Sequence, residues 1–245
     1  GYCPAPYTAF EKKEMGWPVD IQELTDNQKI TMTTPTSDGG TAYKIVNPNN
    51  ANEYIMLELI RQTGWNTEAY GNGLMAYHVN RPSANIGIYD QYNQVPGFPG
   101  MAIIPADSLC MSSYLASDAT SYFNSLAGDL FPGTGNMDNL NVTMLSDSNP
   151  RPNFCWYNTN FSWYNKSANS KLATNRALGD IAYDSATNVL TFNFYTHDVT
   201  NAISSVNNHD NGKHAIYTLD GRYAGTSLQA LPHGIYITEG RKIIK

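Results

Sequence analysis

Two runs of sequence decide the fold, Tyr54-Ile55-Met56-Leu57-Glu58-Leu59 and Leu74-Met75-Ala76-Tyr77-His78-Val79. Both are short and apolar, and the second follows the turn-forming triplet Gly71-Asn72-Gly73. Short apolar runs bounded by turn residues are typical of buried strands rather than of helices. We therefore predict two antiparallel strands that pair around a loop centred near residue 68.

Runs of the same kind recur on both sides of this pair. They occupy residues 29–33, 42–46 and 101–104. A further strand is predicted at 188–195, because Leu190, Phe192 and Phe194 alternate with other residues at the period of a half-buried strand. Residues 106–180 are rich in Asn, Ser and aromatic residues and are predicted to form long loops. Regular spacing of short strands indicates a sandwich or a barrel, and we predict a mainly β chain built on a β-sandwich.

The two ends of the chain carry their own signals. Thr8-Ala9-Phe10-Glu11 has the form of a capping box, which predicts a short helix ending near Gly16. Toward the other end, the turn dipeptide Asp220-Gly221 follows a β-type run at 215–219, and a second run lies at 235–237. The predicted parts are a linker helix at 1–18, a β-sandwich at 19–197, a linker at 198–213 and a small C-terminal β unit at 214–245.

Composition excludes several classes of protein. Of the 245 residues 41% are hydrophobic and 15% are charged, and the formal net charge is −6. Such a chain can bury a core, but it has no basic patch for nucleic acid and no apolar stretch long enough for a transmembrane helix. Cys3, Cys110 and Cys155 are odd in number and form no CxxC pair, so at most one disulfide forms, and we favour buried thiols over a bridge.

The usual catalytic motifs are missing from the sequence. A common zinc peptidase holds its metal with two histidines four residues apart on a helix, and a glutamate between them acts as general base. No two of the five histidines have this spacing, and neither a GxSxG nucleophile motif nor a phosphate-binding loop occurs. We therefore assign no catalytic residue and no zinc ligand to this chain, and we predict that it is inactive alone.

One polar pair lies within the two central runs. In the predicted hairpin Glu58 and His78 fall almost opposite each other, where a charge-assisted hydrogen bond would join them. Such a pair lines a cleft in some proteins and fixes strand register in others. We favour the structural role, in which the pair sets the register or anchors the loop at 61–72.

An oxygen-rich stretch surrounds the Pro-Gly turn at 132–133. Its side chains include Asp129, Asn136 and Asp138. Carboxylate and carbonyl oxygens are the ligands that calcium prefers, so these three residues are candidate calcium ligands. Their spacing is not that of an EF-hand, and an Asn/Asp-rich loop without a metal is the commoner case.

Aromatic residues gather between residues 156 and 164. Trp156, Tyr157 and Trp163 lie among asparagines, and exposed rings beside amides form sugar-stacking platforms. They support an alternative function, that of a surface adhesion or glycan-binding module. Burial of these rings at the open end of the sandwich is the commoner role of large aromatics.

Residues 53–65 read EYIMLELIRQTGW and residues 71–80 read GNGLMAYHVN. Together they resemble the stretch E-Y-hydrophobic-L-E-x-R-x-x-x-G-W … G-x-G-L-L-hydrophobic-x-H-hydrophobic-D of the immune-inhibitor-A type of secreted bacterial zinc metallopeptidases. The chain departs from this pattern at Leu59-Ile60, which adds one residue to the E-x-R portion, and at Asn80, which replaces the usual Asp. Further segments fit the family in the same order, at residues 6–17, 104–107, 128–133 and 178–181.

The resemblance implies that the parent protein is a secreted zinc endopeptidase whose HExxH helix would lie N-terminal to residue 1. This chain would then be a non-catalytic β-domain that supports the catalytic domain or substrate access, with the helix at 1–18 as the joint. The chain itself would hold no zinc, because the zinc would lie in the catalytic domain. Its implied partners are its own catalytic domain and the protein substrates of the parent.

The tail contains residues 216–222 and 231–237 ahead of the basic Arg241-Lys242. With these features residues 214–245 resemble the C-terminal sorting domains of proteins exported by type IX secretion. The resemblance implies that secretion machinery reads the tail and that the protein is secreted or held at the outer cell surface. A small β unit that completes a domain is the plainer interpretation.

Overall fold

The computed structural model of the chain describes residues 5–81, 100–107, 109, 119–141, 154–157, 171–197, 216–218, 222–238 and 241–245. The chain divides into two compact units, Gly1–Thr200 and Asn201–Lys245, and each is described by itself. None of the helices in the described part combines the length and the apolar character needed to cross a membrane.

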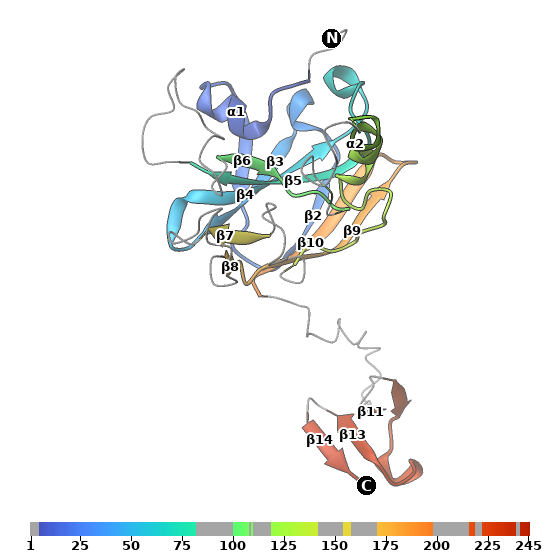
Figure 1. The fold of residues 1–245 in the computed structure, drawn as a ribbon. Helices are drawn as coiled ribbons and strands as arrows, with labels where there is room; N and C mark the ends of the chain where they lie inside the picture. The colour runs from blue at the N-terminus through green and yellow to red at the C-terminus, as the bar shows by residue number, and fades with distance from the viewer. Residues whose placement is uncertain are drawn as a thin grey trace. The chain divides into compact units, whose positions relative to one another are not determined.

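The first unit contains two main sheets (Figure 1). The larger has the strand order β1-β3-β4-β5-β6 and the smaller the order β2-β10-β9. The strands of the larger sheet are β1 (Asp20–Glu23), β3 (Thr41–Asn47), β4 (Asn50–Ile60), β5 (Gly73–Asn80) and β6 (Met101–Ile103). Those of the smaller sheet are β2 (Gln28–Met32), β9 (Ala177–Asp184) and β10 (Val189–Tyr195). The unit also contains the helices α1 (Ala9–Glu14) and α2 (Ala119–Ser125) and the paired strands β7 (Cys155–Tyr157) and β8 (Lys171–Ala173). Short 3₁₀ helices lie at η1 (Thr36–Asp38), η2 (Gly64–Asn66) and η4 (Leu126–Gly128).

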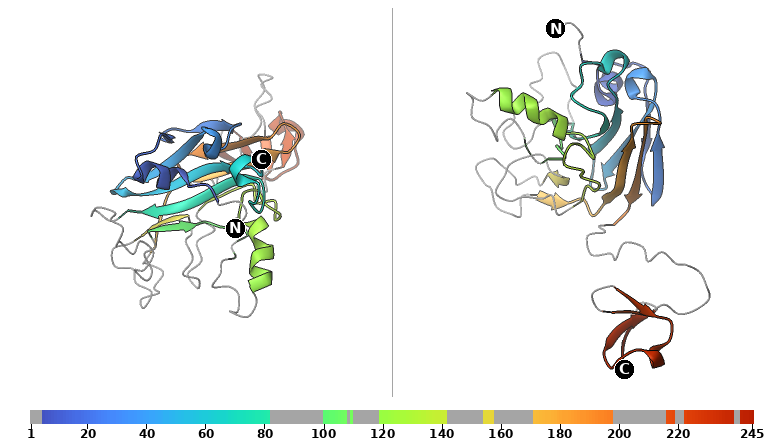
Figure 2. Two further views of the ribbon diagram at one scale, coloured as in Figure 1. Left: turned by 90° about the horizontal axis from the view of Figure 1, so that it is seen from above. Right: turned by 90° about the vertical axis from the view of Figure 1, so that its right-hand side faces the viewer.

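The two sheets pack face to face around one core. Ile55, Leu57 and Leu74 from the larger sheet meet Leu190 and Phe192 from the smaller one. These five side chains are at most 1% exposed. Because each sheet is open and buries one face against the other, the unit is a β-sandwich rather than a closed barrel. Figure 2 shows α2 projecting from the edge of this sandwich.

Helix α1 covers the outer face of the larger sheet. Ala9 and Phe10 are buried there in a second apolar cluster with Tyr54 and Tyr77. Since both faces of β4 are covered, residues 53–59 are all buried, which explains why the apolar residues 54–57 follow one another without alternation. Strand β10 has alternating buried and half-buried residues instead, because only one of its faces meets the core.

The prediction of a mainly β chain with a short N-terminal helix is confirmed. The Thr8 hydroxyl accepts a hydrogen bond from the Glu11 N–H, and the Glu11 carboxylate accepts one from the Thr8 N–H, so the capping box is present. The helix ends at Glu14, just before Gly16, which has a φ of 71°. A positive φ favours glycine and ends the helix here.

Some elements lie where the sequence predicted loops. Strand β9 is the longest of them, and its buried residues Leu178 and Ile181 do not follow a period of two. A bulge interrupts its pairing with β10, and Asp180 at the bulge has a φ of 51°. A bulge adds one residue to a strand and moves the following side chains to the other face, which hides the alternation. Helix α2 lies in the same predicted loop region.

The second unit is a small sheet with the order β12-β11-β13-β14. Its strands are β11 (Ile216–Thr218), β12 (Tyr223–Gly225), β13 (Ile235–Thr238) and β14 (Arg241–Ile244). Strands β11 and β13 coincide with the predicted runs at 215–219 and 235–237. Ile216 and Tyr236 are its buried apolar residues among those described. The predicted linker at 198–213 lies outside the described residues.

Candidate functional site

Strand β4 carries two buried carboxylates. Glu53 and Glu58 are each 1% exposed. Successive side chains of a strand point to opposite faces, so the odd spacing between them places Glu53 on the inner face of the sheet and Glu58 on the outer face. Each accepts hydrogen bonds from a segment that is distant in the sequence.

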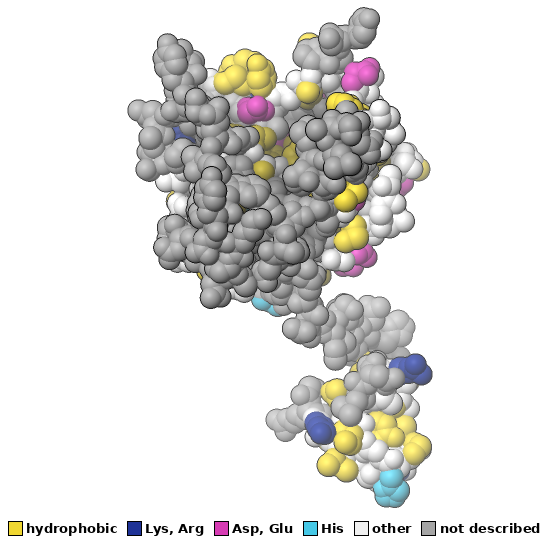
Figure 3. Space-filling view, in the orientation of Figure 1, with side chains coloured by type: hydrophobic (Ala, Val, Ile, Leu, Met, Phe, Trp, Pro, Cys, Tyr) yellow, Lys and Arg dark blue, Asp and Glu magenta, His cyan; other side chains and the backbone are white. Residues whose placement is uncertain are grey.

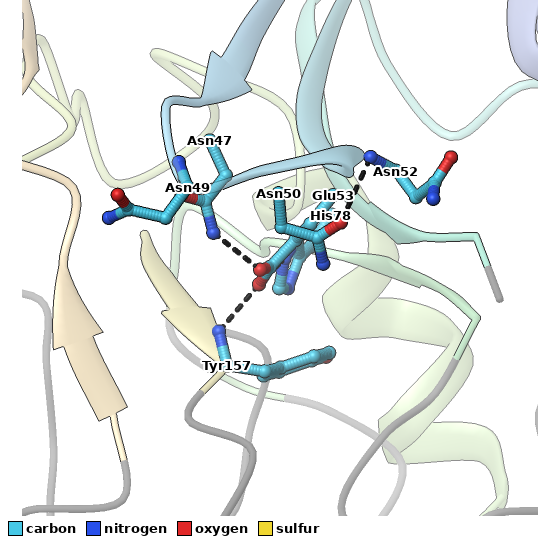
Figure 4. A network of polar contacts seen from close by, with 7 residues as sticks. All are labelled: Asn47, Asn49, Asn50, Asn52, Glu53, His78 and Tyr157. Atoms are coloured by element: carbon cyan, nitrogen blue, oxygen red, sulfur yellow. Dashed lines mark hydrogen bonds and ion pairs between the residues drawn. The ribbon is translucent and has the colours of Figure 1, made fainter. Parts of the chain in front are cut away.

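The Glu53 carboxylate joins three other parts of the unit (Figure 4). Asn47 Nδ2 donates to Glu53 Oε2 over 2.6 Å, and the backbone N–H of Tyr157 donates to Oε1. On the neighbouring strand β5, His78 Nε2 lies 3.0 Å from Glu53 Oε1. Since Tyr157 belongs to β7, Glu53 fastens the β7–β8 pair to the larger sheet.

His78 is fully buried beside this carboxylate. Its ring centroid lies 4.2 Å from that of Tyr157 and 6.2 Å from that of Trp156. A carboxylate against Nε2 favours the tautomer with a proton on that nitrogen, and Nδ1 has no hydrogen-bond partner among the described residues. Burial raises the pKa of the Tyr157 hydroxyl well above its usual value, and negative charge at Cys155 and Glu53 adds to the shift.

The Glu58 carboxylate fastens helix α1 to the outer face of the sheet. The N–H of Ala9, the first residue of α1, donates to Glu58 Oε1 over 2.8 Å. The Tyr77 hydroxyl donates to the same oxygen, and the Thr36 hydroxyl donates to Oε2. Tyr77 Oη in turn accepts the N–H of Phe10 over 3.3 Å, so two consecutive amides of α1 are satisfied by buried side chains of the sheet.

Burial also shifts the pKa values of Glu58 and Tyr77 on the outer face of the sheet. It raises the pKa of the Glu58 carboxyl, while hydrogen bonds from Thr36, Tyr77 and Ala9 oppose that shift. Burial raises the pKa of Tyr77 well above its usual value, and the negative charge of Glu58 raises it further. Tyr77 therefore keeps its proton and remains a donor.

The predicted pair of Glu58 and His78 does not form. In the observed register Glu58 lies opposite Met75 and His78 lies opposite Ile55, so their side chains are on opposite faces of the sheet. The predicted register placed His78 where Met75 lies, an error of three residues (78 − 75). A shift by an odd number of residues moves a side chain to the other face. Both residues are buried polar groups, but their side chains contact other residues. Glu58 accepts a hydrogen bond from Tyr77, and His78 lies within hydrogen-bond distance of Glu53.

Trp156 does not form the exposed platform that a glycan-binding module requires. Its side chain is 3% exposed and belongs to the sandwich core. Tyr157 is half-buried, with its ring against His78. Trp163 lies outside the described residues. Trp156 thus takes the commoner role of a large aromatic, which is burial.

The calcium site stays a prediction. Asp138 Oδ1 accepts a hydrogen bond from Asn139 Nδ2 over 2.9 Å, and the Asp138 carbonyl accepts one from the Ile181 N–H over 2.8 Å. Asn136 lies in the left-handed region with a φ of 50°. The described part of the chain has no group of three or more His, Cys, Asp and Glu side chains placed to hold a metal ion. This absence concerns those four residue types and does not test a site that uses Asn oxygens.

Asp129, the third candidate ligand, lies beside a second carboxylate. Backbone hydrogen bonds join its segment to that of Asp107, from Ala106 N to Asp129 O over 3.0 Å and from Asp107 N to Gly128 O over 3.1 Å. Burial, and then the negative charge of Asp107, raise the pKa of Asp129 to about 7. Asp129 is therefore largely protonated below neutral pH.

We expect the first unit to lose stability as the pH rises from about 4 to about 7. In this range the folded unit keeps a proton on Asp129 that the unfolded chain has released, so raising the pH favours unfolding. The loss should be about 1–2 kcal/mol, because the half-buried carboxyl is partly screened by solvent. Urea unfolding at several pH values measures it. Asp129→Asn should make the profile less steep and leave the contribution of Glu58, whose pKa is also raised, and an unchanged slope in that variant would contradict the assigned pKa.

Cys155 is fully buried in β7, in line with the predicted buried thiol. Cys3 and Cys110 lie outside the described residues. The number of disulfides therefore stays a prediction.

Sequence reasoning missed Glu53 and Tyr77 as partners in these networks. One signal was present, because two glutamates at an odd spacing in an apolar strand must lie on opposite faces. A buried carboxylate needs donors, so a strand buried on both faces requires a polar partner on each side. The identity of those partners depends on register and on distant segments such as α1 and β7.

The arrangement is suited to holding segments together rather than to acid–base chemistry with a dissolved substrate. Both carboxylates are shielded from solvent and receive hydrogen bonds from groups of the fold. Proton transfer to a substrate requires contact within hydrogen-bond reach, which buried side chains do not offer here. The chain matches no protein-family model, no curated protein and no solved structure. We therefore infer its role from its own residues and contacts.

Proposed function

We propose that the chain is a non-catalytic β-domain of a secreted zinc metallopeptidase, which supports the catalytic domain or substrate access. One observation carries the proposal: Glu53, Glu58 and His78, the buried acidic and imidazole side chains of the motif, are engaged inside the fold. A motif whose buried polar groups join distant segments is explained by a structural role. The resemblance of residues 53–80 to the post-catalytic region of the immune-inhibitor-A type supplies the family.

The contacts between the resembling segments support the same proposal. Residues 6–17 meet the central strand pair through Glu58 and Tyr77. Residues 128–133 meet it where Leu74 and Phe131 exchange backbone hydrogen bonds of 2.8 and 2.9 Å. Segments that resemble one family in order would be expected to share one folded unit, and these do.

In this proposal the zinc chemistry belongs to a catalytic domain that precedes the chain in the same polypeptide. Two histidines of an HExxH helix would bind the metal there, and the bound zinc would activate water for peptide hydrolysis. The residues of this chain would stabilise the fold of the neighbouring domain. They would also shape the path by which protein substrates reach it. The unit Asn201–Lys245 would be read by secretion machinery, which would place the protein outside the cell or on its surface.

The encoding reading frame and the metal content of its product test the proposal. We expect an HExxH motif upstream of residue 1 in the same frame, and about one zinc ion bound per complete polypeptide. The purified 245-residue chain is the matched control and should bind no zinc under the same conditions. A frame that starts near residue 1 behind a signal peptide, with no upstream domain, would overturn the proposal.

A further inference from the structure

Three large side chains beside α1 are held at the surface. Tyr7, Met15 and Trp17 are 50%, 41% and 50% exposed. The rings of Tyr7 and Trp17 pack edge to face with their centroids 5.4 Å apart. Figure 3 shows hydrophobic side chains exposed at the surface where Figure 1 places α1. We call these three residues the α1 patch.

The backbone that carries the α1 patch is anchored at several points. Glu58 and Tyr77 accept the first two amides of the helix, and Lys12 Nζ donates to the Thr36 carbonyl over 2.7 Å. After the helix, the Trp17 N–H donates to the Lys12 carbonyl over 2.8 Å and turns the chain back toward Tyr7. The patch is therefore presented in a fixed arrangement.

The ion pair of the helix adds one more anchor. Glu14 Oε2 lies 3.0 Å from Arg81 Nη2 at the end of β5. It ties the last residue of α1 to the sheet, beside Met15. A surface ion pair contributes little energy by itself, but it limits the rotation of the helix.

The α1 patch is not needed to bury the helix. Ala9 and Phe10 already fill the interface with the sheet, and both are at most 5% exposed. Large apolar side chains that are fixed in position yet half-exposed are typical of protein interfaces, where aromatic anchors contribute most of the binding energy. The described part of the sandwich therefore leaves these three side chains about half-exposed.

We propose that the α1 patch is the surface on which the catalytic domain docks. This inference rests on the proposed function, which places that domain directly before this chain. The proposed domain would then be joined to the chain only six residues before Tyr7, so the tether would hold it at high effective concentration beside the patch. Exposed charges of both signs, Lys13 and Asp20, lie near these residues in the sequence, so we expect burial of apolar surface rather than charge to select the partner.

Oxidative footprinting by hydroxyl radicals tests the inference, because it reports the exposure of Tyr, Met and Trp side chains. The complete polypeptide is compared with the 245-residue chain by mass spectrometry. We expect oxidation of Tyr7, Met15 and Trp17 to fall about fivefold or more in the complete polypeptide, as expected for anchors at the centre of an interface. Tyr70, which is 53% exposed and lies in the β4–β5 loop, is the internal control and should not change.

The possible outcomes separate this inference from the proposed function. If the complete polypeptide binds zinc but oxidation of the patch is unchanged, the docking surface is wrong and the proposed function stands. If no zinc domain is encoded, both are wrong. A double variant, Tyr7→Ser with Trp17→Ser, adds a second measurement. It should lower the melting temperature of the complete polypeptide by more than it lowers that of the 245-residue chain, where only the contact between the two rings is lost, and an equal shift in both would overturn the inference.

Discussion

Glu53→Ala is expected to lower the free energy of unfolding of the Gly1–Thr200 unit by about 3–5 kcal/mol. The change would leave Asn47 Nδ2, His78 Nε2 and the Tyr157 N–H buried without their acceptor. Each unsatisfied buried donor costs about 1–3 kcal/mol. Urea unfolding followed by Trp fluorescence measures the effect, since all four Trp residues lie in this unit.

Glu23→Ala is the matched control for this experiment. Glu23 also lies on a strand of the larger sheet, and it forms a surface ion pair with Lys44 at 3.1 Å. An exposed pair of this kind contributes about 0–1 kcal/mol, so the control should unfold close to the unchanged chain. Equal effects of the two substitutions would show that Glu53 does not join the β7–β8 pair to the sheet in the way described.

Glu58→Ala should lower the free energy of unfolding of the same unit by about 2–4 kcal/mol and loosen α1. The Ala9 N–H and the hydroxyls of Thr36 and Tyr77 would lose their acceptor. The expected loss of stability is smaller than for Glu53→Ala, because two of the three donors are hydroxyls. A hydroxyl can rotate toward another acceptor, whereas a backbone amide cannot. Hydrogen exchange of residues 9–12 should accelerate far more than exchange in β4 and β5, because the helix loses its anchor while the strand pairing remains.

Tyr77→Phe provides the control for α1. It keeps the ring in the outer apolar cluster and removes only the hydroxyl that links Glu58 to the Phe10 N–H. We expect a loss of about 1–2 kcal/mol and a partial increase in exchange at residues 9–12. If Glu58→Ala destabilised the unit without faster exchange in α1, Glu58 would not be the anchor of the helix.

Local sequence signals predicted much of the fold. The capping box at Thr8 and Glu11 specifies α1, because both of its hydrogen bonds lie within one turn of the chain. The alternation of Leu190, Phe192 and Phe194 specifies β10, because that strand has one buried face. Strand β9 could not be predicted from alternation, because its bulge at Asp180 breaks the period of two that identifies a strand.

The polar networks were harder to predict, because they depend on strand register. Sequence places Glu58 and His78 in adjacent strands, but only the loop between β4 and β5 decides whether they face each other. That loop offsets the pairing by an odd number of residues and gives each side chain a different partner. The contact of Glu53 with Tyr157 spans 104 residues, and no local pattern reports a contact of that kind.

The two carboxylates of β4 suggest why this strand carries the strongest part of the family resemblance. A strand buried on both faces can fasten one segment on each side, and Glu53 and Glu58 fasten β7 and α1. In the proposed parent protein, the outer network would hold the helix that leads to the catalytic domain. Rigid attachment of that helix would fix the orientation of the domain beside the α1 patch.

Peptide hydrolysis by the purified 245-residue chain tests the central claim most directly. The chain is incubated with an unfolded protein substrate, with added zinc, in parallel with the complete polypeptide. We expect hydrolysis by the complete polypeptide that a chelator abolishes, and none by the chain, because the buried polar residues of β4 and β5 serve the fold. Zinc-dependent hydrolysis by the 245-residue chain alone would contradict the account.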